Sequence, residues 1–153
     1  MKKVWRKAVF VVPYSINKKG IPEFLILKRK LHWIGWEFCK GKIEPKEKKV
    51  DTAIRELKEE TGIGVLKKDV FDHKISGRYL YPKSFKKRPD KLGQTFHLFS
   101  VKVSKTEKIK FDPLEHNKHK WLALEKAIKK ITYSNQRRCL RIVNKYINSQ
   151  KFS

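Results

Sequence analysis

The chain has 153 residues, a length that suits one domain spanning residues 1–153 and leaves little room for a second. Hydrophobic residues make up 39% of the sequence, which is enough for a packed core and excludes wholesale disorder. With 39 Lys and Arg against 15 Asp and Glu, the formal net charge of +24 favours polyanionic partners but specifies no fold.

Apolar runs and turn residues predict strands and helices that are mixed along the chain. The expected strands are residues 4–14, 24–30, 75–81 and 95–103, with a short aromatic strand or loop over 33–38. Loops are expected over 41–47 and 83–91. The expected helices are residues 50–60 with Gly62 as C-cap, a short one after a strand end near Trp121, and 136–147. This mixture predicts an α/β or α+β fold.

Two features bear on the cellular compartment. The two cysteines, Cys39 and Cys139, exclude a disulfide-rich secreted scaffold and indicate free thiols in a reducing cytoplasm. We expect Cys39 to be a packing residue rather than a nucleophile. No run approaches the roughly 18 apolar residues of a membrane-spanning helix. A cytoplasmic protein without membrane attachment is expected, and its oligomeric state stays open.

The acidic residues are concentrated in one region. Residues 37–60 hold seven acids and seven bases, so the whole positive surplus lies outside this stretch. An acidic cluster in a basic protein indicates a divalent-cation site that faces a polyanionic substrate. The alternative is a solvated helix with alternating charges.

The predicted helix over residues 50–60 carries the acidic cluster. Its core-facing stripe consists of Val50, Ala53, Ile54 and Leu57. Glu56, Glu59 and Glu60 share one flank of the helix, where three like charges repel one another unless a cation lies there. They also oppose the helix dipole at its C-terminal end. Hard cations such as Mg²⁺ or Mn²⁺ prefer carboxylate oxygens, so the flank is a candidate metal site.

The spacing of these residues resembles the Nudix box at every defining position. The matching residues are Gly41, Glu47, Arg55, Glu56, Leu57, Glu59, Glu60, Gly62 and Ile63. The resemblance implies an α/β/α sandwich around a mixed sheet. It also implies Mg²⁺- or Mn²⁺-dependent hydrolysis of a pyrophosphate linkage in a nucleoside diphosphate joined to another group. Two positions depart from the family pattern: Cys39 stands where Pro is common, and Lys46 stands where Gly is frequent.

By the same resemblance, Glu56, Glu59 and Glu60 are the metal-binding and water-activating carboxylates. The backbone carbonyl of Lys40 joins the metal ligands. Arg55 and Glu47 hold the loop against the helix and orient the catalytic carboxylate. Either Glu56 or Glu60 is the general base, since the family varies in this respect.

Lys40 and Lys42 flank Gly41 and are candidates for contacts with phosphate oxygens that gain charge in the transition state. For Lys42, a role in loop solubility is an equal alternative.

Three features outside the box resemble the dinucleoside polyphosphate hydrolase branch, whose substrates include diadenosine tetraphosphate. Tyr79 or Tyr81 occupies the region where that branch has a tyrosine, and either can stack on adenine. Glu115 precedes a Trp-Leu strand end and is a candidate extra metal ligand or base. A short helix follows that strand end. The alternatives are a core role for the tyrosines and a solvated role for Glu115.

The charge surplus favours a second substrate for the same chemistry, an RNA 5′ end, because basic surfaces bind RNA through counterion release. His32, Trp33 and Trp36 are candidates for base stacking. The basic side chains that would guide RNA are Lys83, Lys86, Lys87, Arg88, Arg137, Arg138, Arg141 and Lys145. A non-catalytic RNA-binding module is a third hypothesis, and Lys-rich surfaces also arise from the composition of a whole proteome.

Overall fold

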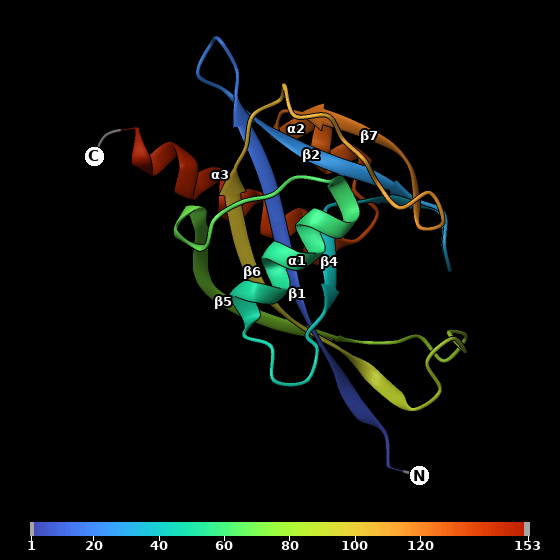
Figure 1. Ribbon diagram of the computed structural model, residues 1–153. Helices are drawn as coiled ribbons and strands as arrows, with labels where there is room; N and C mark the ends of the chain where they lie inside the picture. The colour runs from blue at the N-terminus through green and yellow to red at the C-terminus, as the bar shows by residue number, and fades with distance from the viewer. Residues whose placement is uncertain (1, 152–153) are drawn as a thin grey trace.

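The computed structural model describes residues 2–151 as a sheet with helices on both faces (Figure 1). The strands are β1 (Val4–Ile16), β2 (Pro22–Arg29), β3 (Gly35–Glu37), β4 (Cys39–Lys42), β5 (Val70–Leu80), β6 (Lys91–Lys102) and β7 (His116–Leu122). The helices are α1 (Lys49–Thr61), the 3₁₀ turn η1 (Lys67–Asp69), α2 (Leu124–Lys130) and α3 (Ser134–Gln150).

The seven strands form one mixed sheet whose main path runs β3-β2-β1-β6-β5. The central pair, β1 and β6, is parallel, whereas the other pairs are antiparallel. β4 pairs with the middle of β1 and β7 pairs with β2, off the main path. The parallel pair joins segments about 90 residues apart, so one side-chain row combines residues from the N-terminal strand and from the second half of the chain.

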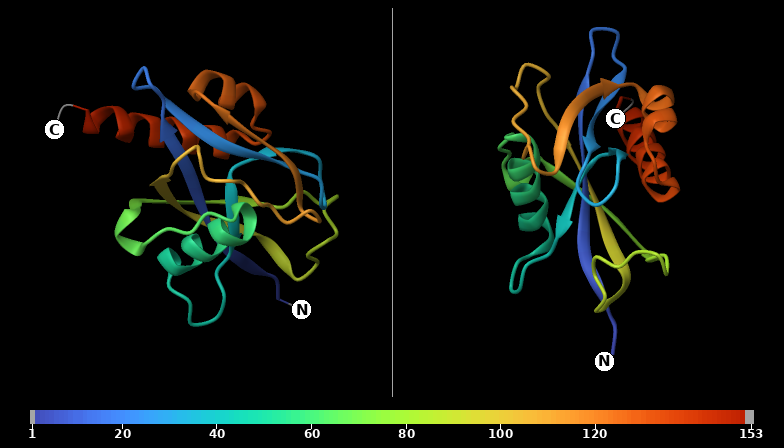
Figure 2. Two further views of the ribbon diagram at one scale, coloured as in Figure 1. Left: turned by 45° about the horizontal axis from the view of Figure 1, so that its top comes forward. Right: turned by 90° about the vertical axis from the view of Figure 1, so that its right-hand side faces the viewer.

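Alternation along β1 divides the core into two layers. Val9 and Val11 belong to the cluster under α1, whereas Phe10 and Val12 belong to the cluster under α2 and α3. Figure 2 shows α1 on one face of the sheet and α2 with α3 on the other. This arrangement is the predicted α/β/α sandwich around a mixed sheet.

The predicted helix over 50–60 is present as α1, and Gly62 ends it as expected. Gly62 has a φ of 81° and its N–H donates to the Lys58 carbonyl at 2.9 Å. The glycine lets the chain turn at the left-handed angle that side chains disfavour.

Several predicted boundaries were wrong. Gly41 was expected in a loop, yet it lies with Lys42 in β4. β5 begins at Val70 rather than at residue 75, because an irregularity around Lys74, with a φ of 54°, breaks its alternation. β7 begins at His116, where a run of polar residues concealed the strand.

Both cysteines are free and buried, as expected. Burial raises the pKa of each thiol, well above its usual value for Cys39 and to about 12 for Cys139. Both thiols therefore stay protonated at neutral pH and pack as small apolar groups. Of the helices within residues 2–151, none is long and apolar enough to cross a membrane.

Candidate functional site

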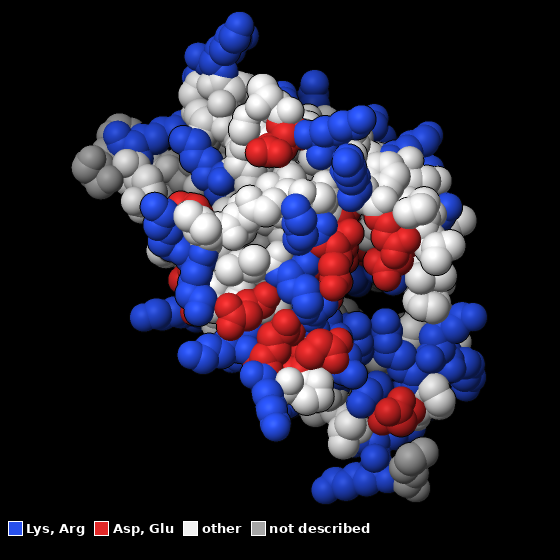
Figure 3. Space-filling view, viewed as in Figure 1, with Lys and Arg blue, Asp and Glu red and all other residues white. Residues whose placement is uncertain are grey.

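A cleft of about 770 Å³ opens beside the C-terminal half of α1. Figure 3 shows a hollow next to acidic side chains on a face that is otherwise rich in Lys and Arg. Its charged lining consists of Glu44, Glu56, Glu59, Glu60 and Glu115 with Arg6, Arg29, Lys40, Lys42, Arg55 and Arg88. Its aromatic and amide lining includes Trp33, Tyr79, Tyr81, Phe85, Tyr133, Gln94, Asn135 and Gln136. Acids, cations and aromatic rings thus share one surface.

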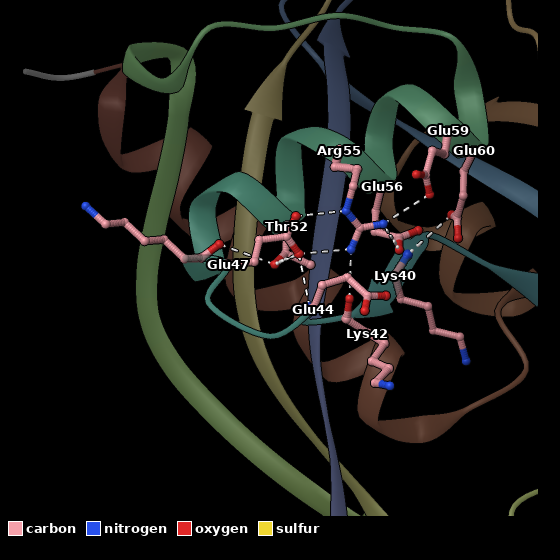
Figure 4. Close-up of polar contacts among 10 residues, drawn as sticks. Lys40, Lys42, Glu44, Glu47, Thr52, Arg55, Glu56, Glu59 and Glu60 are labelled. Atoms are coloured by element: carbon pink, nitrogen blue, oxygen red, sulfur yellow. Dashed lines mark hydrogen bonds and ion pairs between the residues drawn. The ribbon is translucent and has the colours of Figure 1, made fainter.

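Two of the box carboxylates lie against β4. The carboxyl group of Glu56 occupies the space above Gly41, so a β-carbon at that position would collide with it. Glu60 is only 4% exposed and accepts a hydrogen bond from the backbone N–H of Lys40 at 3.3 Å. The absence of a side chain at Gly41 therefore allows α1 to present Glu56 at the edge of the cleft (Figure 4).

Arg55 ties the loop between β4 and α1 to the helix. Its guanidinium donates to both oxygens of Glu47, at 2.8 and 3.0 Å, and to the carbonyl of Lys42 at 2.9 Å. Glu47 also accepts from the Thr52 hydroxyl at 2.7 Å and from the Glu44 N–H at 3.1 Å. These bonds, with the one from Arg55 as the largest cause, lower the pKa of Glu47 to about 2.

The same guanidinium reaches two box carboxylates. Its Nη1 donates to Glu56 at 2.8 Å and to Glu59 at 3.1 Å (Figure 4). Arg55 therefore fixes the orientation of Glu56 relative to the loop. The geometry brings Arg55 and Glu47 together as the sequence predicts.

Removal from water disfavours the charged forms of Glu56 and Glu60. Burial raises the pKa of Glu56 to about 7, although Arg55 opposes the rise. Burial, followed by the charges of Glu37, Glu56 and Glu115, raises the pKa of Glu60 well above its usual value. Because a nearby cation favours the charged form of a carboxyl group, a cation bound here would stabilise the carboxylates of Glu56 and Glu60.

The donor set fits a divalent cation, although within residues 2–151 no three Asp, Glu, His or Cys side chains are already arranged to hold one. Arg55 is the positive charge that now bridges Glu56 and Glu59. Carboxylate oxygens are the ligands that Mg²⁺ and Mn²⁺ prefer. Burial and then the neighbouring acidic charges disfavour the charged form of Glu60 and raise its pKa, and such an ion would favour that form.

A buried ion-pair network beside the carboxylates was not predicted. Glu37 is fully buried and contacts Arg29 at 3.1 Å, the Lys40 ammonium at 3.2 Å and His116 at 2.9 Å. Although burial favours its neutral form, Lys40, His116 and Arg29 lower the pKa of Glu37 to about 2. This network holds the Lys40 side chain beside the box. The signal in the sequence was a pair of opposite charges at the ends of two neighbouring segments, Arg29 after an apolar run and Glu37 after Trp36.

The predicted substrate-binding residues divide into two groups. His32, Tyr79 and Tyr81 line the cleft, as do Lys40, Lys42 and Glu115. Trp36 does not line it. The ring of Trp36 instead lies under the ammonium groups of Lys120 and Lys130, whose nitrogens are 5.8 and 5.7 Å from the ring centroid. Trp33, which was also predicted to stack on bases, lines the cleft. Stacking of a base on Trp36 stays a prediction, and such a base would lie outside this cleft.

Comparison with known proteins identifies the family. The family model described as NUDIX domain matches residues 4–141. The chain belongs to the Nudix family. It is a Nudix hydrolase by this match and by its likeness to solved Nudix hydrolases. None of the curated proteins matches the sequence.

Several solved structures are similar over nearly the whole chain. A binary complex of C. elegans Ap4A hydrolase is 27% identical, with a TM-score of 0.74, covering 94% of this chain and 98% of that one. A second structure of C. elegans Ap4A hydrolase is 26% identical, with a TM-score of 0.66 and coverages of 94% and 99%. E. coli dihydroneopterin triphosphate pyrophosphohydrolase is 24% identical, with a TM-score of 0.76 and coverages of 93% and 99%, and supports the fold alone.

We predict that Gly41→Ala destabilises the protein by about 1–3 kcal/mol, the usual cost of forcing extra atoms into a packed site. The added carbon would collide with the carboxyl group of Glu56. Urea denaturation measures the change. Gly64→Ala is the matched control, because the nearest atom there is Lys58 Nζ at 3.8 Å. Equal stability of the two variants would contradict the proposed contact.

We predict that Glu37→Gln lowers the free energy of unfolding by about 3–5 kcal/mol at pH 7, because it leaves buried cations without their partner. The pKa of Glu37 is lower in the folded state, so its contribution is present above pH 4.5 and lost as the pH falls toward 2. The difference in the free energy of unfolding between wild type and variant, measured by urea denaturation, therefore becomes smaller over that pH range. Asp51→Asn, which breaks an exposed pair with Lys67, is the control and costs less than about 1 kcal/mol.

Proposed function

We propose that this Nudix hydrolase cleaves a phosphoanhydride bond in dinucleoside polyphosphates such as diadenosine tetraphosphate, giving ATP and AMP. The observation that carries the proposal is a single cleft lined by the three box glutamates, by cations and by aromatic side chains. The likeness to C. elegans Ap4A hydrolase, at 27% identity across nearly all of both chains, supports this choice of substrate.

In this proposal Glu56, Glu59 and Glu60 hold Mg²⁺ or Mn²⁺, with the carbonyl of Lys40 and the carboxylate of Glu115 as further ligands. The ion supplies charge neutralisation at the phosphate and a lower pKa for bound water. Glu115 lies in the cleft, and its charge contributes to the raised pKa values of Glu56 and Glu60, which supports a place near them.

Side chains of the protein position the catalytic carboxylate and accept the proton of the attacking water. Either Glu56 or Glu60 accepts it from the attacking water, and a raised carboxylate pKa suits that role at neutral pH. Arg55 and Glu47 act as positioning residues, because their bonds fix Glu56 relative to the loop. Lys40 and Lys42 line the same wall and bind phosphate oxygens.

Aromatic residues on the remaining walls bind the nucleoside. The ring centroids of Tyr79 and Tyr81 lie 6.1 Å apart, and those of Trp33 and Tyr133 lie 4.9 Å apart. Flat rings in a cleft stack on bases. His32 lines the same region with a φ of 73°, a strained conformation of the kind that concentrates at functional sites.

An RNA 5′ end is the alternative substrate. The segment between β5 and β6 borders the cleft through Pro82, Phe85 and Arg88 and carries exposed Lys83, Lys86 and Lys87. A basic segment at the rim favours a ligand that extends beyond the cleft.

The substrate test compares diadenosine tetraphosphate with 5′-triphosphate RNA at equal Mg²⁺ and ionic strength. We expect ATP and AMP from the first, with a kcat/KM at least tenfold above that for release of terminal phosphates from the RNA. Separation of products by ion-exchange chromatography gives both rates. Faster conversion of the RNA would replace the proposed substrate with the alternative.

We predict that Glu60→Gln lowers kcat by about 10²- to 10⁴-fold, the usual contribution of a general base or its equivalent. The melting temperature should stay unchanged or rise, because a buried and repelled charge is removed. Glu44→Gln removes an exposed carboxylate from the same cleft and should retain kcat within about twofold. Full activity of Glu60→Gln would exclude the assignment. Salt-sensitive RNA binding without any hydrolysis would favour the non-catalytic module.

A further inference from the structure

Two arginines in the cleft lack an acidic partner. Arg6 comes from β1 and Arg88 from the segment between β5 and β6, and both line the cleft. Within residues 2–151 no Asp or Glu forms an ion pair with either of them. The other two arginines of the cleft, Arg29 and Arg55, both have such partners.

A chain of hydrogen bonds connects the unpaired arginines. Nη1 of Arg6 donates to Oε1 of Gln94 at 2.6 Å, and the Tyr81 hydroxyl donates to the same oxygen at 3.1 Å. Nη1 of Arg88 lies 3.5 Å from the Tyr81 hydroxyl oxygen, and its guanidinium lies over the rings of Tyr81 and Phe85. Neutral acceptors therefore hold the two cations in place without neutralising them.

Gln94 adds a free donor to the cluster. Because its Oε1 accepts from Arg6 and Tyr81, the other end of the amide is the NH₂ group. Gln94 is only 1% exposed, and its Nε2 is buried without a hydrogen-bond partner among the described residues. An unpaired buried donor is costly, which points to a ligand that accepts its hydrogen bond.

The electrostatics of the pair point the same way. Burial, and next the charge of Arg88, lowers the pKa of Arg6. Two guanidinium groups and a free amide donor that share one cleft favour an anion with several acceptor oxygens.

The register of the sheet places this cluster one side-chain row from the box. Lys42 pairs with Ala8, and Arg6 lies two residues further along β1, which is roughly 7 Å at the rise of a strand. Arg6 is paired with Gln94, which in turn is paired with Tyr79. The row lies in the same cleft as the carboxylates, yet it contains none itself.

We propose that Arg6, Arg88 and the amide of Gln94 form a second phosphate subsite. It binds the phosphates of the substrate that lie away from the carboxylates and so favours substrates with long phosphate chains. The role in substrate choice rests on the proposed function, whereas the binding of a polyphosphate anion does not.

The first test measures binding of inorganic tripolyphosphate by calorimetry, without metal and at fixed ionic strength. Arg6→Met should weaken binding about 10- to 100-fold, the usual value of hydrogen bonds between charged partners. Lys7→Met is the matched control, because it removes the same charge from the neighbouring position, which is exposed on the opposite face of β1. Equal losses in the two variants would show attraction by net charge alone and overturn the subsite.

A second variant guards against a folding defect in the first. Gln94→Glu supplies a carboxylate beside Arg6 and Arg88, so it should retain or raise the melting temperature while it weakens tripolyphosphate binding at least tenfold. Undiminished binding by this variant would also overturn the subsite.

The third measurement links the subsite to hydrolysis. For Arg6→Met, the loss in kcat/KM should be larger for diadenosine tetraphosphate than for ADP-ribose and should appear mainly in KM. An equal loss for both substrates would contradict a role of the subsite in recognising the length of the phosphate chain. If the wild type hydrolyses neither, the proposed function fails, while tripolyphosphate binding that depends on Arg6 still supports the subsite.

Discussion

The site depends on keeping carboxylates close together in a place that water barely reaches. Glu37 and Glu60 are buried and Glu56 is half-buried on adjoining elements, and after burial itself the charges of Glu37 and Glu56 raise the energy of the charged form of Glu60. Compensation is uneven: Glu37 has three cationic or polar partners and Glu56 has Arg55, whereas Glu60 has the Lys40 N–H and the Cys39 thiol but no ion pair within residues 2–151. The charged form of Glu60 is therefore the least compensated of the three, and an added cation would favour it most.

The surrounding structure holds these carboxylates in their unevenly compensated positions. Gly41 lets Glu56 lie across β4, and Arg55 prevents Glu56 from turning away by bonding it and the loop together. Glu47 receives four of the surrounding hydrogen bonds and so fixes Arg55 in turn. Glu47, Glu56 and the Lys42 carbonyl are coupled in position, because all three accept from the same guanidinium.

The sequence predicted the parts of the site that are close together along the chain. The spacing of the box is a property of one helix and its preceding loop, so α1 and its Gly62 cap followed from local rules, whereas the Arg55–Glu47 contact was implied by the resemblance to the Nudix box. The departure at Lys46 is informative in the same way: its φ of 66° retains the left-handed turn for which Gly is frequent.

The residues that were missed depend on contacts between distant segments. Arg29, Glu37 and His116 meet only because β2 pairs with both β3 and β7. Arg6 meets Gln94 through a parallel pairing that no local pattern specifies.

The net charge of +24 explains less of the specificity than its size suggests. At physiological salt the Debye length is about 8 Å, so exposed lysines far from the cleft act weakly on a bound ligand. They still raise the rate at which any polyanion meets the protein. Discrimination needs charges that are partly buried and have no internal partner, and among the arginines of the cleft only Arg6 and Arg88 meet this condition within residues 2–151. The surface charge therefore attracts polyanions in general, while selection by the number and position of phosphates falls to the unpaired arginines of the proposed subsite.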